Sequence, residues 1–297
     1  MIRVRDLHKS FGTGASTAHV LKGLSFDIRP GLMTGFVGGN GAGKTTTMRI
    51  LLGVLDHDAG EITVDGTPID AQYRSGIGYM PEERGLYPKM PVLDQLVFLA
   101  QLRGLTVADA RRRATALLER LDLGARAKDR LEELSLGNQQ RAQVAAALVH
   151  DPVALVLDEP FSGLDPHAVD TTLAVLRETA DTGVPVLFSS HQLDVVERLC
   201  DELVILADGR VRAAGTRDDL LAAHAGHEWE LRAATDAGWV RAVDRVEATF
   251  LDGGHVRFTA DEATAQAVLR EAAARGGVHA FGPVTRTLHE IFTEATR

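Results

Sequence analysis

The chain has 297 residues, 45% of them hydrophobic and 25% charged, so it can bury a substantial core in one large or two ordinary domains. Its net charge of −9 disfavours nonspecific nucleic-acid binding, and no apolar run approaches the roughly 18 residues that span a bilayer. The single cysteine, Cys200, excludes an intrachain disulfide, and the N-terminus lacks the apolar core of a secretory signal, so we expect a soluble protein in a reducing cytoplasm.

The first 70 residues predict strands that surround one helix. IRVRDL, LSFDI and EITVDG are short alternating or β-branched stretches, which are typical of an antiparallel β layer. LMTGFVG predicts a further strand that leads into the glycine-rich GGNGAGKTT, and KTTTMRILLGVL continues with a helical pattern.

The glycine-rich stretch fits the phosphate-loop pattern G-x-x-x-x-G-K-[ST] at Gly38, Gly43, Lys44 and Thr45. Glycines let backbone N–H groups point at a β-phosphate, the lysine reaches the β- and γ-phosphate oxygens, and the threonine hydroxyl ligates Mg²⁺. The helix that begins near Lys44 adds its positive dipole end. A GTPase would need an Asn-Lys-x-Asp motif, but the only asparagines, Asn40 and Asn138, do not precede lysine.

The segment from about 88 to 150 predicts a helical insert. Apolar residues recur at three- and four-residue spacing from 91 to 131, and the Arg111–Arg113 run is expected on a solvated helix face. ELSLGNQQRAQ follows, with Ser135 and Gly137 just ahead of a helix-favouring run. This is a second candidate anion site, although Ser135 could also be an ordinary helix N-cap.

VALVLDEP and VPVLFSSH predict strands buried on both faces, as in a parallel sheet covered by helices. The first strand ends in Asp158 and Glu159, and alternation along a strand would aim their side chains differently. Asp158 suits a Mg²⁺ shell, and Glu159 could orient and deprotonate an attacking water. ELVILADGRVRAAG then predicts a hairpin that turns at Asp208-Gly209.

After about Gly215 the sequence predicts strand, hairpin, helix, strand and helix, which together form a small α+β unit. From Arg217 onward the chain carries nine arginines, no lysine and thirteen acidic residues, which argues against a nucleic-acid appendage. His224 and His227 could share a metal, but a surface loop is the favoured interpretation.

Six motifs in order make the chain resemble the ABC ATPases over residues 1 to about 215. GGNGAGKTT resembles their Walker A, YMPEERGLYP their Q-loop, LSLGN their signature, LVLDEP their Walker B, SGLD their D-loop, and SSH their switch histidine. The resemblance implies an α/β fold with a P-loop ABC ATPase core, in which a parallel sheet carries an antiparallel β layer and a helical insert at about 88–150. It also implies a nucleotide-binding domain at 1–215 and a small C-terminal α+β accessory domain at 216–297.

In this family two ATPase domains pair head to tail, and the signature of one caps the γ-phosphate of ATP held by the other. By this resemblance Ser135 and Gly137 contact the partner's ATP, although LSLGN departs from the usual LSGGQ at Leu136 and Asn138. Asp165 matches the aspartate that communicates across the dimer. The ATP-binding residues carried over within one chain are Gly38, Asn40, Gly41, Gly43, Lys44, Thr45 and Thr46.

The resemblance assigns catalysis to Glu159 and to His191, which would hold the γ-phosphate and position the water. Phe11 lies where an aromatic ring usually stacks on adenine, although it could equally be a core residue. Thr45, Asp158 and Glu82 would hold Mg²⁺. Glu82 replaces the usual glutamine of the Q-loop, which adds negative charge near the γ-phosphate unless Arg84 offsets it.

The sequence therefore predicts the ATP-hydrolysing subunit of an ABC transporter, with ATP and Mg²⁺ as cofactors. The resemblance is strongest to ATPase subunits of prokaryotic efflux systems for drugs, antibiotics or sodium. The expected partners are a second copy or a related ATPase subunit and a polytopic membrane permease, which would contact RGLYPKMPV at the cytoplasmic face of the membrane. The alternative is a soluble ABC-type ATPase that acts on ribosomes or nucleic acid. Such proteins generally carry two ATPase domains or a long coiled-coil insert.

Overall fold

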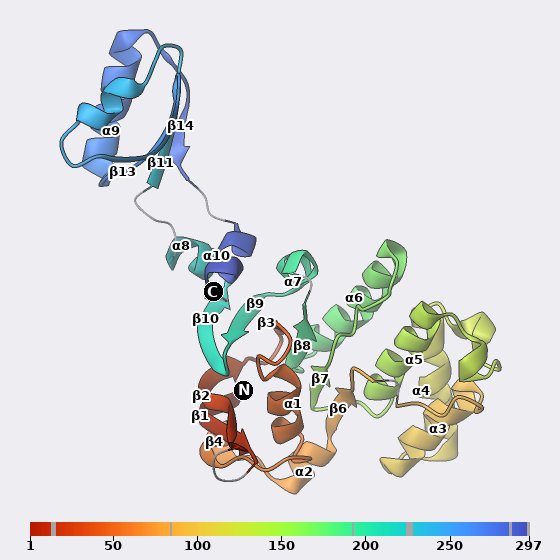
Figure 1. Ribbon diagram of the computed structural model, residues 1–297. Helices are drawn as coiled ribbons and strands as arrows, with labels where there is room; N and C mark the ends of the chain where they lie inside the picture. Colours follow the sequence, from red (N-terminus) through yellow and green to blue (C-terminus); the bar gives the residue numbers. More distant parts are fainter. Residues whose placement is uncertain (13–15, 84, 192, 224–227, 285–286, 296–297) are drawn as a thin grey trace. The chain divides into compact units, whose positions relative to one another are not determined.

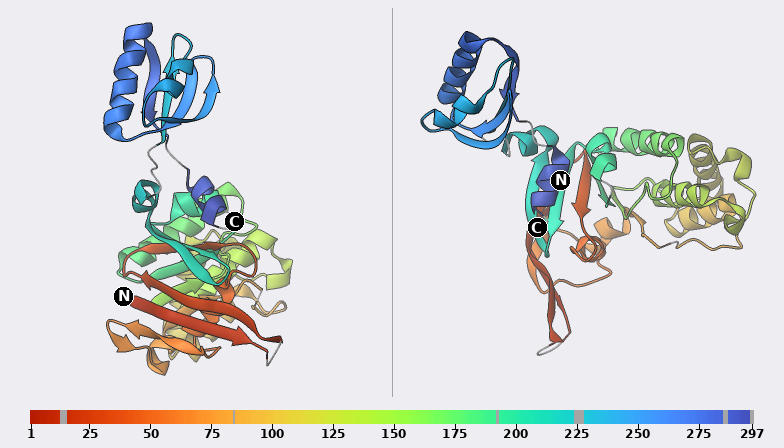
Figure 2. Two further views of the ribbon diagram at one scale, coloured as in Figure 1. Left: turned by 60° about the vertical axis from the view of Figure 1, so that its left-hand side comes forward. Right: turned by 45° about the horizontal axis from the view of Figure 1, so that its top comes forward.

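The computed structural model describes residues 1–12, 16–83, 85–191, 193–223, 228–284 and 287–295, so Arg84, His224 and His227 lie outside the described residues. Contacts divide the chain into two compact units, Met1–Arg217 with Phe292–Arg297, and Asp218–Ile291. Figures 1 and 2 show the elements of both units, coloured along the sequence.

The first unit is built on a six-stranded sheet whose order is β10-β9-β3-β8-β7-β6. Five strands run parallel, and β10 pairs antiparallel with β9 through the predicted hairpin, where Asp208 and Gly209 take left-handed φ values of 52° and 74°. The predicted parallel sheet is confirmed, because every residue of β3, β7, β8 and β9 is buried. The strands are β3 (Met33–Gly38), β6 (Ile77–Met80), β7 (Ala154–Leu157), β8 (Val186–Ser190), β9 (Glu202–Ala207) and β10 (Arg210–Thr216).

The predicted antiparallel layer is also present, as a second sheet with the order β2-β1-β4-β5. Its apolar face, helix α1 (Lys44–Leu51) and one face of the parallel sheet share a single core, in which Leu7, Phe36 and Met48 are completely buried. In the left view of Figure 2, the strands of this layer face the viewer, in red and orange. Its strands are β1 (Ile2–Phe11), β2 (Ala18–Ile28), β4 (Ala59–Val64) and β5 (Thr67–Pro68).

The predicted helical insert contains α3 (Val92–Leu102), α4 (Val107–Arg120) and α5 (Leu136–Leu148). The helical pattern predicted to 131 stops earlier, because Asp122 takes a left-handed φ of 57° and two 3₁₀ turns follow, Gly124–Arg126 and Leu131–Glu133. Further helices of this unit are α2 (Ala71–Ser75), α6 (Pro166–Asp181) and α7 (Leu193–Leu199). Within the described residues, no helix combines the length and hydropathy that crossing a membrane requires.

The second unit is the predicted small α+β fold, with a four-stranded antiparallel sheet of order β12-β13-β11-β14. This order is that of a split β-α-β fold in which the first helix is reduced to the 3₁₀ turn η4 (Gly238–Ala242). Helix α9 (Glu262–Arg275) packs its buried Ala265 and Val268 against Leu231, Val256 and Phe258 of the sheet. The strands are β11 (Glu228–Ala233), β12 (Glu247–Asp252), β13 (His255–Thr259) and β14 (Val278–Pro283), and the chain also forms α8 (Arg217–Ala223) and α10 (Leu288–Ala295).

Candidate functional site

Most of the predicted site residues lie at one edge of the parallel sheet. Strands β3, β6, β7 and β8 are parallel, so the segments that follow their carboxyl ends meet at the same edge, where ligands of open α/β sheets bind. These segments surround a cavity of about 430 Å³. It is lined by Val20, Gly39, Asn40, Gly41, Ala42, Gly43, Lys44, Thr45, Thr46, Glu82, Asp158, Glu159 and His191.

The glycine-rich loop joins β3 to α1 in the expected strand–loop–helix order. Gly41 and Gly43 take φ values of 80° and 106°, a left-handed conformation that glycine adopts without a steric penalty. Lys44 opens α1, and its Nζ donates to the Gly38 carbonyl at 2.6 Å and the Gly39 carbonyl at 3.3 Å. The ammonium group is therefore held over the loop, at the positive end of the helix dipole.

Asp158 follows β7 and is almost completely buried, with 1% of its surface exposed. Thr45 Oγ1 donates to its Oδ2 at 2.8 Å, and the Ser189 hydroxyl donates to its Oδ1. A threonine hydroxyl and a carboxylate thus converge beside the phosphate loop, and Glu82 lines the same cavity. Hard oxygen donors of this kind fit Mg²⁺, which needs only one or two protein carboxylates besides phosphate and water.

The carboxylates of Asp158 and Glu159 have different partners, but strand alternation is not the cause. Strand β7 ends at Leu157, and Glu159 takes a left-handed φ of 54° just beyond it. Its backbone N–H donates to Ser189 Oγ at 2.9 Å, and its carbonyl accepts from Gln140 Nε2 at 2.7 Å. Both ends of this strained residue are therefore anchored.

The Glu159 carboxylate is paired with the imidazole of His191, with 2.9 Å between Oε1 and Nδ1. Burial raises the pKa of Glu159 above its ordinary value, and the His191 hydrogen bond and the Lys44 charge oppose that rise only in part. The pair combines a buried carboxylate with a half-exposed imidazole. A proton acceptor and a neighbouring hydrogen-bond donor therefore face the cavity together.

The predicted signature and D-loop residues do not line this cavity. Ser135 is the N-cap of α5 and accepts from the Asn138 N–H at 3.3 Å, so the alternative helix-cap role is present in the isolated chain. Asp165 caps α6 and accepts from the Ala168 N–H at 2.9 Å.

The signature and the D-loop nevertheless lie beside each other. A Cβ atom added at Gly137 would lie 3.5 Å from the Gly163 carbonyl oxygen. Leu136, which replaces the usual glycine, is 60% exposed. Gly38 also lies outside the cavity lining but accepts the Lys44 hydrogen bond.

Phe11 ends β1 and is 42% exposed, so its ring is not a core residue. The Lys9 ammonium lies 5.6 Å from the ring centroid. This leaves an accessible aromatic face at the end of a strand, although Phe11 is not among the residues that line the cavity.

Sequence reasoning missed Ser189 and Gln140, the two residues that anchor Glu159. Ser189 had one available signal, because a hydroxyl inside the apolar strand VLFSS is buried and needs a hydrogen-bond partner. Gln140 gave none, since its partner is a backbone carbonyl 19 residues away.

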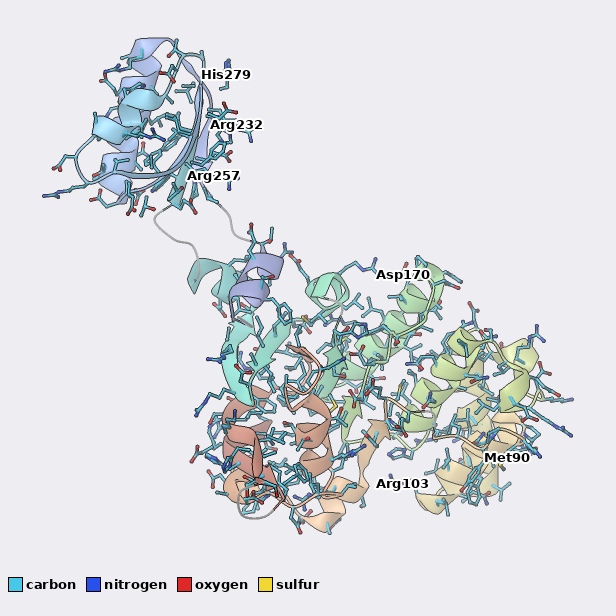
Figure 3. All side chains as sticks on the ribbon, in the orientation of Figure 1. Met90, Arg103, Asp170, Arg232, Arg257 and His279 are labelled. Atoms are coloured by element: carbon cyan, nitrogen blue, oxygen red, sulfur yellow. The ribbon has the colours of Figure 1, made fainter. Side chains whose placement is uncertain are left out.

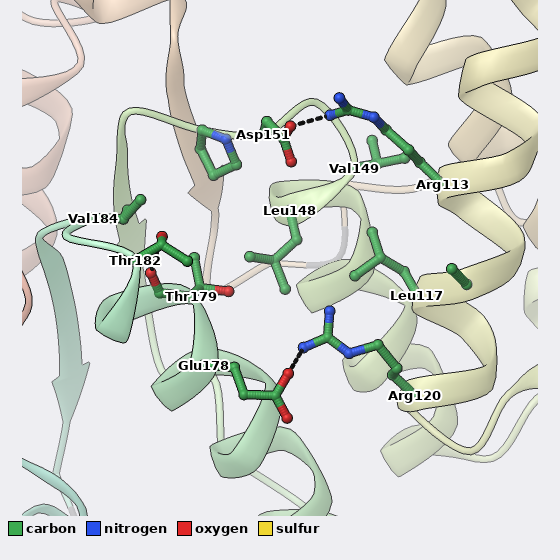
Figure 4. A pocket seen from close by; sticks show the side chains of 12 residues that line it. Arg113, Leu117, Arg120, Leu148, Val149, Asp151, Glu178, Thr179, Thr182 and Val184 are labelled. Carbon is green, nitrogen blue, oxygen red and sulfur yellow. Dashed lines mark hydrogen bonds and ion pairs between the residues drawn. The ribbon is translucent and has the colours of Figure 1, made fainter.

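A larger cavity, about 540 Å³, lies between α4, the end of α5 and α6, and contains none of the predicted site residues (Figure 4). Leu117 and Leu148 contribute apolar walls, and two ion pairs, Arg113–Asp151 and Arg120–Glu178, cross its rim. These charges are already paired, so we place the candidate active site at the phosphate loop instead.

Comparison with known proteins agrees with this geometry. Residues 21–162 match the protein family described as ABC transporter, and residues 215–296 match the family described as ATP-binding protein DrrA1-3-like, C-terminal domain. The chain is 36% identical to the uncharacterized ABC transporter ATP-binding protein YhaQ of Bacillus subtilis strain 168, over 99% of this chain and 98% of that protein. It is 37% identical to the linearmycin resistance ATP-binding protein LnrL of the same strain, over 74% of this chain and 70% of that protein.

Among solved structures, the fold is similar to the dimeric post-hydrolysis state of the ATP-binding cassette MJ0796 bound to ADP and Pi. The TM-score is 0.66 at 22% identity, over 73% of this chain and 98% of that one, so this likeness shows the fold alone. The near full-length similarity to YhaQ shows the family directly. With its phosphate loop and paired carboxylates at one sheet edge, the chain belongs to the family of ABC transporter ATP-binding proteins.

Proposed function

We propose that the chain is the ATP-hydrolysing subunit of an ABC exporter and powers a separate membrane permease from the cytoplasmic face of the membrane. The observation that carries this proposal is the cavity in which the phosphate loop, the Thr45–Asp158 hydrogen bond and the Glu159–His191 pair meet. This cavity brings together residues that can bind phosphate and a carboxylate that can accept a proton from water.

ATP binding is assigned to the loop residues Asn40, Gly41, Gly43, Lys44 and Thr46. Backbone N–H groups of the loop and the Lys44 ammonium would donate to the phosphate oxygens, and the N-terminus of α1 would add its partial positive charge. Thr45 and Asp158 would hold Mg²⁺, together with Glu82. When bound, the ion supplies positive charge that offsets the charge on the phosphate oxygens.

Glu159 is the candidate general base. In its ionised form, the carboxylate would accept a proton from water as the water oxygen attacks the γ-phosphorus. The bond from that phosphorus to the β–γ bridging oxygen would break, which releases ADP and phosphate. His191 holds the carboxylate at 2.9 Å and presents the rest of its half-exposed ring to the cavity, where it can hydrogen-bond to the γ-phosphate. Ser189 and Gln140 keep the Glu159 backbone in place during this step.

A second copy or a related subunit would complete the site. Ser135 and Gly137 lie outside the cavity of their own chain, at the start of a 13-residue helix whose N-terminus can receive an anion. We infer that they cap the ATP bound by a partner, that Asp165 lies at the shared interface, and that Phe11 stacks on adenine. The dimeric MJ0796 cassette has the same fold and is consistent with such pairing.

We propose that the permease binds at a hollow beside the Q-loop segment. A cavity of about 340 Å³ is lined by Leu86 of that segment and by Leu99 and Leu102 of α3. Leu102 is 66% exposed, so its side chain is available to a partner. An apolar segment of the permease would cover these leucines.

Export rather than uptake is inferred from the name of one relative. LnrL is named for linearmycin resistance. Resistance to a compound is readily provided by pumping it out of the cell, so we place this chain with efflux systems.

The test is to isolate the tagged chain from host membranes and identify what co-purifies. We expect a polytopic membrane protein that stimulates the ATPase. Leu102→Glu should abolish the stimulation and leave basal hydrolysis unchanged, whereas Val153→Glu, a matched change at a residue that is 45% exposed and outside this hollow, should preserve both. Recovery with ribosomes or nucleic acid instead of a membrane protein would favour the soluble alternative.

A further inference from the structure

The sheet of the second unit has one open face. Side chains alternate across strands, and α9 covers the face that carries Leu231, Val256 and Phe258. Figure 3 shows Arg232 and Arg257 on the opposite side of the sheet from α9. Among the described residues of this unit, no helix covers that opposite face.

The strand register sets four residues of the open face in one row across the sheet. Phe250 of β12 pairs with Arg257 of β13, Arg257 pairs with Glu230 of β11, and Glu230 pairs with Gly282 of β14. From one edge to the other, the row carries a large ring, a positive charge, a negative charge and no side chain. If a second copy of the row is turned end for end, its ring lies over the position without a side chain and its positive charge lies over the negative one.

Both ends of the row are open. Phe250 is 45% exposed, so much of its ring is available to contact another surface. A Cβ atom added at Gly282 would meet nothing within 4 Å, so the opposite edge has room for a ring. Arg257 forms no ion pair among the described residues, whereas Glu230 already contacts Arg232 and His255.

We propose that this open face, defined by Phe250, Arg257, Glu230 and Gly282, pairs with the same face of a second copy. A two-fold axis parallel to the strands, between β13 and β11, reverses the row. It sets Phe250 over the partner's Gly282 and Arg257 against the partner's Glu230, and symmetry repeats both contacts. The pairing is separate from the ATP-driven pairing of the proposed function, because it needs no nucleotide.

The neighbouring rows are compatible with the same axis. One sets Glu228 opposite the partner's Thr259, a carboxylate against a hydroxyl. The other sets His255 opposite the partner's Arg232, and each of these two side chains already contacts the Glu230 carboxylate of its own chain, which offsets positive charge there. Four strands at about 4.8 Å spacing and five residues at about 3.3 Å give a face of about 19 by 16 Å. This is about 300 Å² for each copy and about 600 Å² for the pair, below the roughly 1,200 Å² at which stable interfaces begin, so we expect weak, reversible association in the micromolar range.

The test is sedimentation of the full chain without nucleotide. We expect the wild-type chain to dimerise reversibly, and Glu230→Arg and Arg257→Glu each to weaken dimerisation about tenfold or more, because every dimer then contains two like-charge contacts. Phe250→Ala should also weaken it. Arg270→Glu, the same charge reversal on the exposed surface of α9, is the matched control and should leave dimerisation unchanged.

Mixing the two charge variants separates the proposal from a folding defect. In a mixed dimer, Arg257 of one chain meets Glu230 of the other, and the introduced Arg and Glu meet at the second contact, so association should return. Each chain keeps its own like-charged neighbours on mixing, so misfolded variants would not recover. Three results would overturn the proposal. The wild-type chain could stay monomeric at about 100 μM, well above the expected range. The charge variants could dimerise as tightly as the wild type, or their mixture could fail to associate.

Discussion

The substitution Glu159→Gln tests whether the carboxylate accepts a proton, because glutamine has nearly the same shape as glutamate but carries a neutral amide. The backbone of Glu159 is anchored by Ser189 and Gln140. Among the described residues, its side chain forms no hydrogen bond or ion pair with the phosphate loop, so ATP affinity should be unchanged. The amide cannot accept the proton of the attacking water. We expect turnover to fall about 10²- to 10⁴-fold, the usual contribution of a general base.

Two further expectations follow from the raised pKa of Glu159, one for the wild-type chain and one for the variant. Wild-type activity should be lost as pH falls through a value above the ordinary 4.5, because the base must be ionised. Since the folded-state pKa is raised, ionisation of Glu159 costs native stability above that pKa. Glu159→Gln should therefore raise the melting temperature at pH 8, and the difference should disappear as pH falls toward the ordinary carboxyl pKa.

The assay combines steady-state ATPase rates, nucleotide affinity and gel filtration with ATP, in which the slow variant should accumulate as a closed dimer. Glu178→Gln is the control, since Glu178 is an exposed carboxylate paired with Arg120 outside the candidate site. Hydrolysis by Glu159→Gln at near wild-type rates would remove Glu159 from the role of base. Loss of ATP affinity would show instead that the carboxylate shapes the binding site.

Four other predictions address the remaining assignments. Mixing a Lys44→Ala chain with a Ser135→Arg chain should restore ATPase activity that neither chain has alone. About half of the dimers are then mixed, and each mixed dimer has one intact site of two. If the sites work independently, the mixture should recover about a quarter of the wild-type rate. No recovery after confirmed subunit exchange would contradict the head-to-tail site unless hydrolysis needs both sites intact. Glu82→Gln should stay active, whereas Glu82→Ala should lose Mg²⁺-dependent stimulation by the permease; normal stimulation would exclude Glu82 as a ligand. Truncation after about Gly215 should preserve ATP binding, measured by equilibrium titration, and alter self-association, and a folded truncation without nucleotide affinity would refute this division. Burial raises the pKa of Cys200 to about 12, so alkylation at pH 8 should be slow in the native chain and fast after unfolding, as mass spectrometry would show.

The local chemistry of the candidate site could be predicted from the sequence. The glycine spacing before Lys44 specifies a loop that only residues tolerant of left-handed φ can form, and Gly41 and Gly43 adopt such angles. Apolar strands buried on both faces implied a parallel sheet, and a parallel sheet brings its carboxyl ends to one edge. The roles assigned to Glu159, His191 and Ser135 remain predictions.

Only the tertiary structure decided which distant groups meet. Ser189 and Gln140 reach the Glu159 backbone from β8 and α5, and a hydrogen bond to a backbone group leaves no pattern in the sequence. In the second unit, alternation predicts which residues share a face of one strand. It does not predict the register between strands, which alone puts Phe250, Arg257, Glu230 and Gly282 in one row. Register depends on the packing of the whole buried face, and a shift of one residue would send each side chain to the other side of the sheet.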